Sequence, residues 1–254
     1  MPKLMGLDDE QTRKTGISKF QFSAVAASTL GASEYTIVST IVDVSGSVVG
    51  FRNELEKCLG TVTETCRKSP RSENLLMRLV SFNTKVEEIH GFRELKNINP
   101  TDYDGILDCD GMTAMFDAVQ NGLEATVDYG KDLFDMEYGV NGIAFVITDG
   151  LDNASKLSNP GKIASLLKQV RQDEKLESMI VVLIGVTEQG QNGQNVRDAL
   201  EQIKTDAGFD QFIDIGEATP SKLAKLAAFI SQSVSSQSQA LGTGGPSNQI
   251  SMEF

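Results

Sequence analysis

The sequence predicts an α/β fold in which a mostly parallel sheet is covered by helices on both faces. Strand-like and helix-like segments alternate along most of the chain. The strand-like segments are apolar on both faces, which is typical of strands buried inside a parallel sheet. With 254 residues and 40% hydrophobic residues, the chain can bury a sizeable core.

The first half of the chain supplies two strands, a hairpin partner and a helix. The run "YTIVSTIVD" at 35–43 is a continuous apolar segment of the kind found in buried strands. Apolar residues then recur at helical spacing from Phe51 to Cys66. A second strand is predicted at 74–82, and "KVEEIHGF" at 85–92 is predicted to pair with it as a hairpin.

The second half continues the alternation and ends in a helix. That last helix begins at a Thr219-Pro220 pair, because threonine caps free N–H groups and proline fits the first helical turn. The preceding elements are a helix at 113–127, a strand at 142–150, a helix at 160–171, a strand at 178–186, a helix at 196–205 and a strand at 209–215.

The two ends of the chain differ from this regular pattern. Phe20 and Phe22 occupy alternate positions near the N-terminus, which predicts a short added strand or a loop that wraps the domain. The C-terminal region is rich in Ser, Gln and Gly, which is typical of a flexible segment, although its last residues, "NQISMEF", could add a strand to a sheet edge. We therefore expect an N-terminal extension at 1–34, one main domain at 35–236 and a flexible tail at 237–254.

Composition argues against several classes of partner and compartment. The chain has 35 acidic and 23 basic residues, a net charge of −12, and no basic block that would grip nucleic acid or an anionic membrane. The start "MPKLMGLDDEQ" does not resemble a signal peptide, and no apolar run reaches the roughly 18 residues needed to span a bilayer. We expect a soluble protein.

The cysteines point to a reducing compartment. Cys58 and Cys66 would lie about 12 Å apart on one helix, which is too far for a disulfide, and Cys109 is the odd one out. We read the cysteines as small core residues and expect a cytoplasmic location.

Oxygen-bearing side chains gather where the predicted parallel strands end. Asp43 ends the first strand and is followed by Ser45 and Ser47, while Asp149 ends the strand at 142–150. Thr113 begins a helix after a glycine-bearing loop. Because the carboxyl ends of parallel strands meet at one edge of a sheet, these five side chains are predicted to lie together.

This donor set suits a hard divalent cation. Three hydroxyls and two carboxylates favour Mg²⁺ or Mn²⁺, with Ca²⁺ also possible, whereas zinc is disfavoured because the only histidine, His90, and the cysteines lie elsewhere. Helix capping would account for one hydroxyl, not for three hydroxyls and two acids. With three hydroxyls among the direct ligands, we expect part of the metal charge to stay uncompensated, and a carboxylate from a partner would complete both the coordination and the charge.

The three motifs, in this order, resemble the metal-ion-dependent adhesion site of von Willebrand factor A domains. They are the D-x-S-x-S of Asp43 to Ser47, the G-x-T of Gly111 to Thr113 and the T-D-G of Thr148 to Gly150, and the resemblance covers about 35–236. It implies a Rossmann-like three-layer sandwich with one antiparallel edge strand. It also implies that Ser45, Ser47 and Thr113 ligate Mg²⁺ while Asp43 and Asp149 bind directly or through water.

The resemblance also suggests a biological setting. The segments "LGASEYT" and "LGTGGPS" look like those of short stand-alone A-domain proteins of bacteria and their phages. Bacterial relatives of this kind work with AAA+ ATPases or with kinase and phosphatase neighbours. The resemblance therefore implies an adaptor in an assembly, signalling or stress-response process.

Two surface segments near the predicted site leave alternatives open. The acidic stretch at 102–110 is either a solvated loop or a source of negative potential, or it holds a second, calcium-like ion. The polar loop at 187–195 and the segment at 151–159 either vary freely or frame a partner surface.

Three functions are compatible with the sequence. The first is a non-enzymatic binding module in which Mg²⁺ captures a carboxylate of a protein partner. The second is an assembly protein that self-associates through its tail, 231–254. The third is a metal-assisted hydrolase, which is disfavoured because the site has few carboxylates and lacks a general base. A serine hydrolase is also disfavoured, because there is no G-x-S-x-G motif and His90 is expected on the surface or half-buried in a strand.

Overall fold

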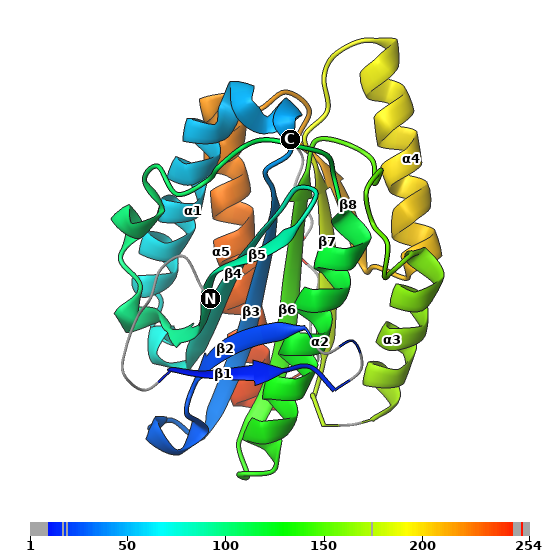
Figure 1. Cartoon of the computed structure of the whole chain (residues 1–254). Coiled ribbons are helices and arrows are strands. Elements are labelled where there is room, and N and C mark those ends of the chain that lie inside the picture. The colour runs from blue at the N-terminus through cyan, green and yellow to red at the C-terminus, as the bar shows by residue number, and fades with distance from the viewer. Residues whose placement is uncertain (1–9, 17, 19, 174, 246–249, 251–254) are drawn as a thin grey trace.

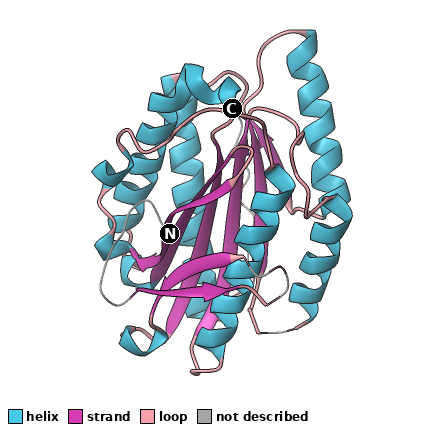
Figure 2. Cartoon of the chain, in the orientation of Figure 1, coloured by secondary structure: helices cyan, strands magenta, loops and turns pink. Residues whose placement is uncertain are grey.

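The computed structural model describes residues 10–16, 18, 20–173, 175–245 and 250, and within them an eight-stranded sheet lies between two layers of helices (Figures 1 and 2). The strands are β1 (Glu10–Lys14), β2 (Gln21–Val25), β3 (Glu34–Asp43), β4 (Leu75–Phe82), β5 (Val86–Glu94), β6 (Gly139–Thr148), β7 (Met179–Gly185) and β8 (Gln211–Asp214). The α-helices are α1 (Arg52–Arg67), α2 (Met115–Phe134), α3 (Pro160–Gln172), α4 (Gln191–Ala207) and α5 (Pro220–Thr243).

The sheet has the order β1-β2-β5-β4-β3-β6-β7-β8 and is mostly parallel. Strands β4, β3, β6, β7 and β8 pair in parallel, while β5 pairs antiparallel with β4 and β1 antiparallel with β2. The predicted α/β, Rossmann-like three-layer fold is therefore confirmed. The hairpin partner of β4 is also confirmed, but it is not the outermost strand, because β2 joins it at Ala24 and Phe92.

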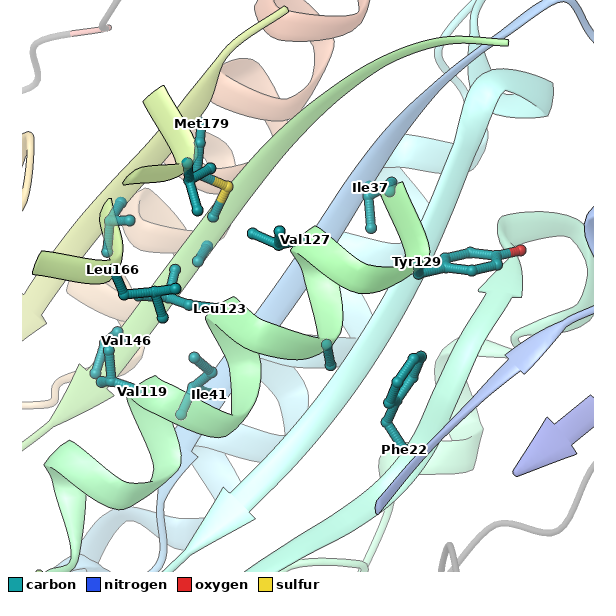
Figure 3. Close-up of a cluster of buried hydrophobic side chains, with 14 of the residues drawn as sticks. Phe22, Ile37, Ile41, Val119, Leu123, Val127, Tyr129, Val146, Leu166 and Met179 are labelled. Atoms are coloured by element: carbon teal, nitrogen blue, oxygen red, sulfur yellow. The ribbon is translucent and has the colours of Figure 1, made fainter. Parts of the chain in front are cut away.

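Each face of the sheet has its own helical layer and core. Helices α1 and α5 pack together on one face, and α2, α3 and α4 cover the other. Figure 3 shows the core between α2 and the sheet, to which α2 contributes Val119, Leu123 and Val127 and the sheet contributes Ile41 and Val146. Apolar residues on both sides of β3 and β6 thus explain why these strands are buried throughout.

Two helices are longer than the sequence pattern predicted. Helix α2 continues past the predicted end at 127 to Phe134, because Tyr129 and Leu133 remain buried. Helix α4 begins at Gln191, so the last part of the predicted loop 187–195 is helical. The sequence pattern did not predict this first turn, because its exposed residues are polar and the pattern identifies helices by the spacing of apolar residues.

The predicted flexible tail was wrong for residues 237–243, which complete α5. These residues are held by specific contacts, since Asn141 donates to the Gln237 carbonyl at 2.9 Å and Arg71 to the Ser238 hydroxyl at 2.9 Å. Leu241 is buried, and the helix ends at Gly244, where φ is +64°. The final segment that was predicted to add a strand lies outside the described residues, apart from Ile250.

The N-terminal segment forms the hairpin β1–β2, which extends the sheet beyond β5 (Figure 1). Phe22 packs edge-on against Phe92, which stacks on Tyr129 of α2. The hairpin approaches β5 so closely that a Cβ on Gly91 would lie 2.2 Å from the Ser23 carbonyl oxygen. The predicted added strand is thus two strands, and a glycine at position 91 is needed for them to dock.

His90 is not a surface or half-buried residue, as the sequence pattern suggested, but is almost fully buried in β5. Its Nδ1 lies 2.9 Å from the Gly91 carbonyl oxygen, which can only accept, so Nδ1 carries the proton. Its Nε2 then accepts from the Tyr103 hydroxyl at 3.0 Å. Burial lowers the pKa of His90 to about 4, and the charges of Arg93 and Arg78 act in the same direction.

Two of the three cysteines are buried, as the expectation of small core residues requires. Cys58 and Cys66 are buried in α1, Cys109 is half-buried, and all three are free thiols. In the described part of the chain, no helix combines the length and apolar character that a membrane span requires.

The buried neutral His90 predicts a loss of stability in acid. Its pKa is about 4 in the folded chain against 6.5 when exposed, so the unfolded chain binds the extra proton as pH falls through this window. We expect this residue to remove about 3 kcal/mol of unfolding free energy between pH 7 and pH 4. Urea denaturation should show a smaller loss for His90→Gln than for the unsubstituted chain, and an equal loss in the two proteins would contradict this assignment.

Candidate metal centre

The parallel pairing of β3 with β6 brings two predicted site residues to one edge of the sheet. The register aligns Val42 with Ile147, so Asp43 ends β3 beside Thr148 at the end of β6, and Asp149 follows. This edge lies near the top of Figure 1. The site therefore depends on strand register, which the buried apolar faces of both strands fix.

Asp43 is held rigidly at the bottom of the site. Only 1% of its surface is exposed. One carboxylate oxygen accepts from the backbone N–H of Ser45 at 2.8 Å, which turns the chain sharply after the strand. The other accepts from the Thr148 hydroxyl at 2.6 Å. Both bonds orient the carboxylate toward the loop that carries the serines.

A chain of hydrogen bonds connects the two serines with Asp149. The Ser47 hydroxyl donates to Asp149 Oδ1 at 2.9 Å, and the Ser45 and Ser47 hydroxyl oxygens lie 3.2 Å apart. Ser45 is buried and Ser47 is exposed, so the serine pair reaches from the buried acid to the surface. Four of the five predicted residues are thus directly connected.

Thr113 is brought to the same edge by backbone contacts of its loop. Gly46 donates to the Gly111 carbonyl at 3.2 Å, and Asp110 donates to the Val44 carbonyl at 3.0 Å, which docks the loop against the serine turn. On its other side, the Thr113 N–H donates to the Asn153 side chain at 2.8 Å. Within the described residues, no hydrogen bond joins the Thr113 hydroxyl to the other four.

The electrostatics of the two acids favour a cation. Burial raises the pKa of Asp43 to about 6, and the charge of Asp149 acts in the same direction. Burial also raises the pKa of Asp149, with a further contribution from the charge of Glu188. Among the described residues, neither acid has a lysine or arginine partner within ion-pair distance. Desolvated carboxylates without a basic partner are stabilised by a bound metal ion.

The donor set fits a hard cation better than a soft one. No group of three or more His, Cys, Asp or Glu side chains gathers anywhere in the described ranges. The candidate ligands are thus the two carboxylates and three hydroxyls described above. Hydroxyl and carboxylate oxygens are ligands for Mg²⁺, Mn²⁺ and Ca²⁺.

Several supporting residues were not predicted to have a role. Thr148 anchors Asp43, and Asn153 holds the loop of Thr113 by donating its backbone N–H to the Thr113 carbonyl at 3.0 Å. Asp117, buried in the first turn of α2, accepts three backbone N–H groups, those of residues 156–158, at 2.8 to 3.0 Å. The polar residues after the strand at 142–150 could have indicated a supporting role near the site, but sequence spacing does not show which loop they contact.

The acidic stretch at 102–110 serves separate structural tasks. Asp102 accepts from the Asn99 backbone N–H at 2.9 Å and caps a short helical turn. Asp110 accepts from the Asn83 amide at 2.5 Å, while Asp104 is exposed to solvent. In the described part of the chain no three of these acids come together, so the structure gives no support for a second, calcium-like site there.

Asp117→Asn tests whether Asp117 stabilises the folded chain by holding the loop at 156–158. The new NH₂ group would face the backbone N–H of Lys156, so one hydrogen bond is lost and two donors meet. We expect a loss of about 1–3 kcal/mol in unfolding free energy. Asp135→Asn, an exposed change just after the same helix, should have little effect in the same urea denaturation. Equal stabilities of the two variants would contradict the role given to Asp117.

Comparison with known proteins shows similarity in fold. No protein-family profile matches the sequence, and no curated protein matches it. The minor pilin PilB of Streptococcus sanguinis superimposes with a TM-score of 0.57 at 16% identity, over 85% of this chain and 64% of the pilin. The pilus adhesin SpaC of Lactobacillus rhamnosus GG gives 0.55 at 10% identity, over 90% of this chain and 35% of the adhesin.

A third solved structure is described with an occupied metal site. Proximal thread matrix protein 1 of the mussel byssus, "with zinc occupied MIDAS motif", gives a TM-score of 0.51 at 15% identity, over 81% of this chain and 47% of that protein. This chain thus spans less than two thirds of each of these proteins. At such identities the comparisons establish a shared α/β fold, of the kind that the resemblance to von Willebrand factor A domains implies.

Proposed function

We propose that this chain is a non-enzymatic, metal-dependent interaction module. Asp43, Ser45, Ser47, Thr113 and Asp149 hold Mg²⁺, and the metal binds an acidic side chain of a protein partner. The observation that carries the proposal is the meeting of two unpaired carboxylates and a serine pair at the end of two parallel strands. The mussel protein with zinc in its MIDAS motif supports a divalent cation, and Mg²⁺ is our specific choice.

Apolar side chains around the site support a protein partner. Six large hydrophobic side chains are exposed among the described residues, and three of them, Val49, Met112 and Leu151, lie within two positions of a proposed ligand. Leu157 follows in the same loop as Leu151, whereas the other two lie at the opposite end of α2. Exposed apolar side chains close to a binding site are typical of protein interaction sites.

A hydrolase is less consistent with the site. Hydrolysis by a metal-bound water requires a group that accepts a proton near the metal. The single histidine of the sequence is buried in β5 and bonded to Tyr103, so it cannot serve as that group, and the nearby carboxylate of Glu188 would have to do so. The solved structures with a similar fold are named as a pilin, an adhesin and a matrix protein.

Self-association through the tail remains a second proposal, with less support. Ile250 packs against the core of its own chain, and its carbonyl accepts from the Gln211 side chain at 3.0 Å. Residues 237–243 are part of α5, so a truncation after Gln239 would remove a folded turn. These contacts direct the described part of the tail toward its own domain.

The partner class and compartment are also proposals. We propose a cytoplasmic adaptor of bacterial or phage origin whose partner is an AAA+ ATPase or a kinase or phosphatase. Three free cysteines are consistent with a reducing compartment. Nucleic acid and membrane are not proposed, because the chain carries a net charge of −12.

Asp43→Asn tests the metal site directly. In EDTA we expect the variant to be at least as stable as the unsubstituted chain, because a buried charge becomes a neutral amide. Mg²⁺ at a hundredfold excess over its dissociation constant should stabilise only the unsubstituted chain, by about 2.7 kcal/mol. Thermal unfolding with Mg²⁺, Mn²⁺, Ca²⁺ and Zn²⁺ measures both effects and ranks the metals.

The control for this measurement is Asp104→Asn, which removes an exposed acid from the neighbouring loop. Its response to Mg²⁺ should equal that of the unsubstituted chain. An undiminished Mg²⁺ response of Asp43→Asn would show that the cation binds elsewhere.

Metal-dependent partner capture is the second test. Proteins retained from a cell extract by the immobilised chain in Mg²⁺ should be released by EDTA, and Asp43→Asn should not retain them. Amidation of the carboxylates on the released proteins should prevent rebinding. Partners that stay bound in EDTA would count against capture through the metal.

A further inference from the structure

A groove of about 740 Å³ opens directly beside the proposed metal site. Ser47 and Asp149 are among the residues that line it. The other lining residues come mainly from the first turn of α4, the segment 186–189 that precedes it and the segment 217–219 that precedes α5. A partner residue next to the metal-bound carboxylate would therefore enter this groove.

The lining of the groove combines apolar side chains with two exposed acids in addition to Asp149. Val186 is buried, and Phe51 and Val196 are half-buried, whereas Glu188 and Glu217 are exposed. A long side chain with an aliphatic stem and a positive head fits this arrangement, because the stem covers the apolar side chains while the head reaches the carboxylates. Lysine and arginine are the side chains of this kind.

The two glutamates are available to such a head group. In the described ranges, neither Glu188 nor Glu217 has an ion-pair partner, and Arg197 is already paired with Asp214. Lys222 lies over Gly216 and is not among the groove residues. The groove thus presents uncompensated negative charge to a partner.

The segment that carries Glu188 is fixed in place. A Cβ on Gly193 would lie 1.7 Å from the Glu188 carbonyl oxygen, so the first turn of α4 packs directly on this segment. Thr187, next to it, donates its hydroxyl to Asp214 at 2.8 Å. A segment held in this way is pre-organised for a ligand, which reduces the entropic cost of binding.

We infer that the groove selects partner segments in which a lysine or arginine stands at a fixed spacing from the metal-bound Asp or Glu. This inference rests on the proposed function of the metal site. It adds a specificity that the metal alone cannot supply, because any exposed carboxylate can bind a metal. The charge of Glu188 and Glu217 also disfavours partners with several adjacent acids.

A random dodecapeptide library displayed on phage tests the inference with the full chain. Phage bound in Mg²⁺ and eluted with EDTA should be enriched in one acidic residue with a lysine or arginine at one constant spacing. Selection on Glu188→Gln/Glu217→Gln should keep the acidic residue and lose the basic one. Selection on Glu64→Gln/Glu201→Gln, which changes two exposed glutamates outside the groove, should give the original motif.

The dissociation constant of one selected peptide measures how much the two glutamates contribute to binding. The groove variant should bind it about fivefold more weakly at low salt, with a smaller difference at high salt, as expected for exposed ion pairs. Because the charge of Glu188 acts on Asp149, both proteins are compared at Mg²⁺ concentrations that saturate their metal sites, and a retained thermal response to Mg²⁺ shows that the fold and metal site of the variant are intact.

The outcomes separate the two proposals. An EDTA-eluted pool with an acidic residue but no basic one overturns the groove inference and leaves the metal site standing. A basic residue that persists on the groove variant also overturns it, because that residue binds elsewhere. A pool with no EDTA-dependent enrichment overturns the proposed function and the inference together.

Discussion

The candidate site depends on one constraint, the in-register parallel pairing of β3 and β6. This pairing places Asp43 and Thr148 side by side, and the 2.6 Å hydrogen bond between them holds the buried carboxylate in position. A shift of one residue would turn every side chain of a strand to the opposite face. Since both faces of β3 and β6 contact helices, the hydrophobic core that fixes the register also fixes the geometry of the site.

The sequence predicted most of the fold and four connected site residues because the underlying signals are local. Buried strands such as β3 and β6 show as continuous apolar runs, and Asp43 and Asp149 are found simply by following these runs to their ends. The site location also follows from a general rule, since ligand sites in parallel sheets lie at the carboxyl ends of the strands. Whether the five residues bind a metal stays a prediction.

Sequence patterns failed where polar residues take part in long-range packing. Ser238 and Gln237 resemble linker residues, yet they are buried in α5 by contacts with Arg71 and Asn141, which are distant in sequence. His90 was expected near the surface because one strand position does not show that Tyr103 covers it. The first turn of α4 carries exposed polar residues, so it lacks the apolar spacing that identifies a helix.

A site poor in carboxylates places the determinants of specificity outside the metal itself. Two carboxylates balance the formal charge of a divalent cation, but two carboxylates and three hydroxyls leave an octahedral ion an open coordination position, which a carboxylate of almost any protein can fill. Selection among partners must then come from surfaces next to the metal. The exposed side chains of Val49, Met112 and Leu151 favour apolar residues of a partner, and the groove with Glu188 and Glu217 favours a basic residue. Affinity and specificity thus have separate physical origins: the metal supplies a general attraction, and the loops around it restrict which acidic residues can use it.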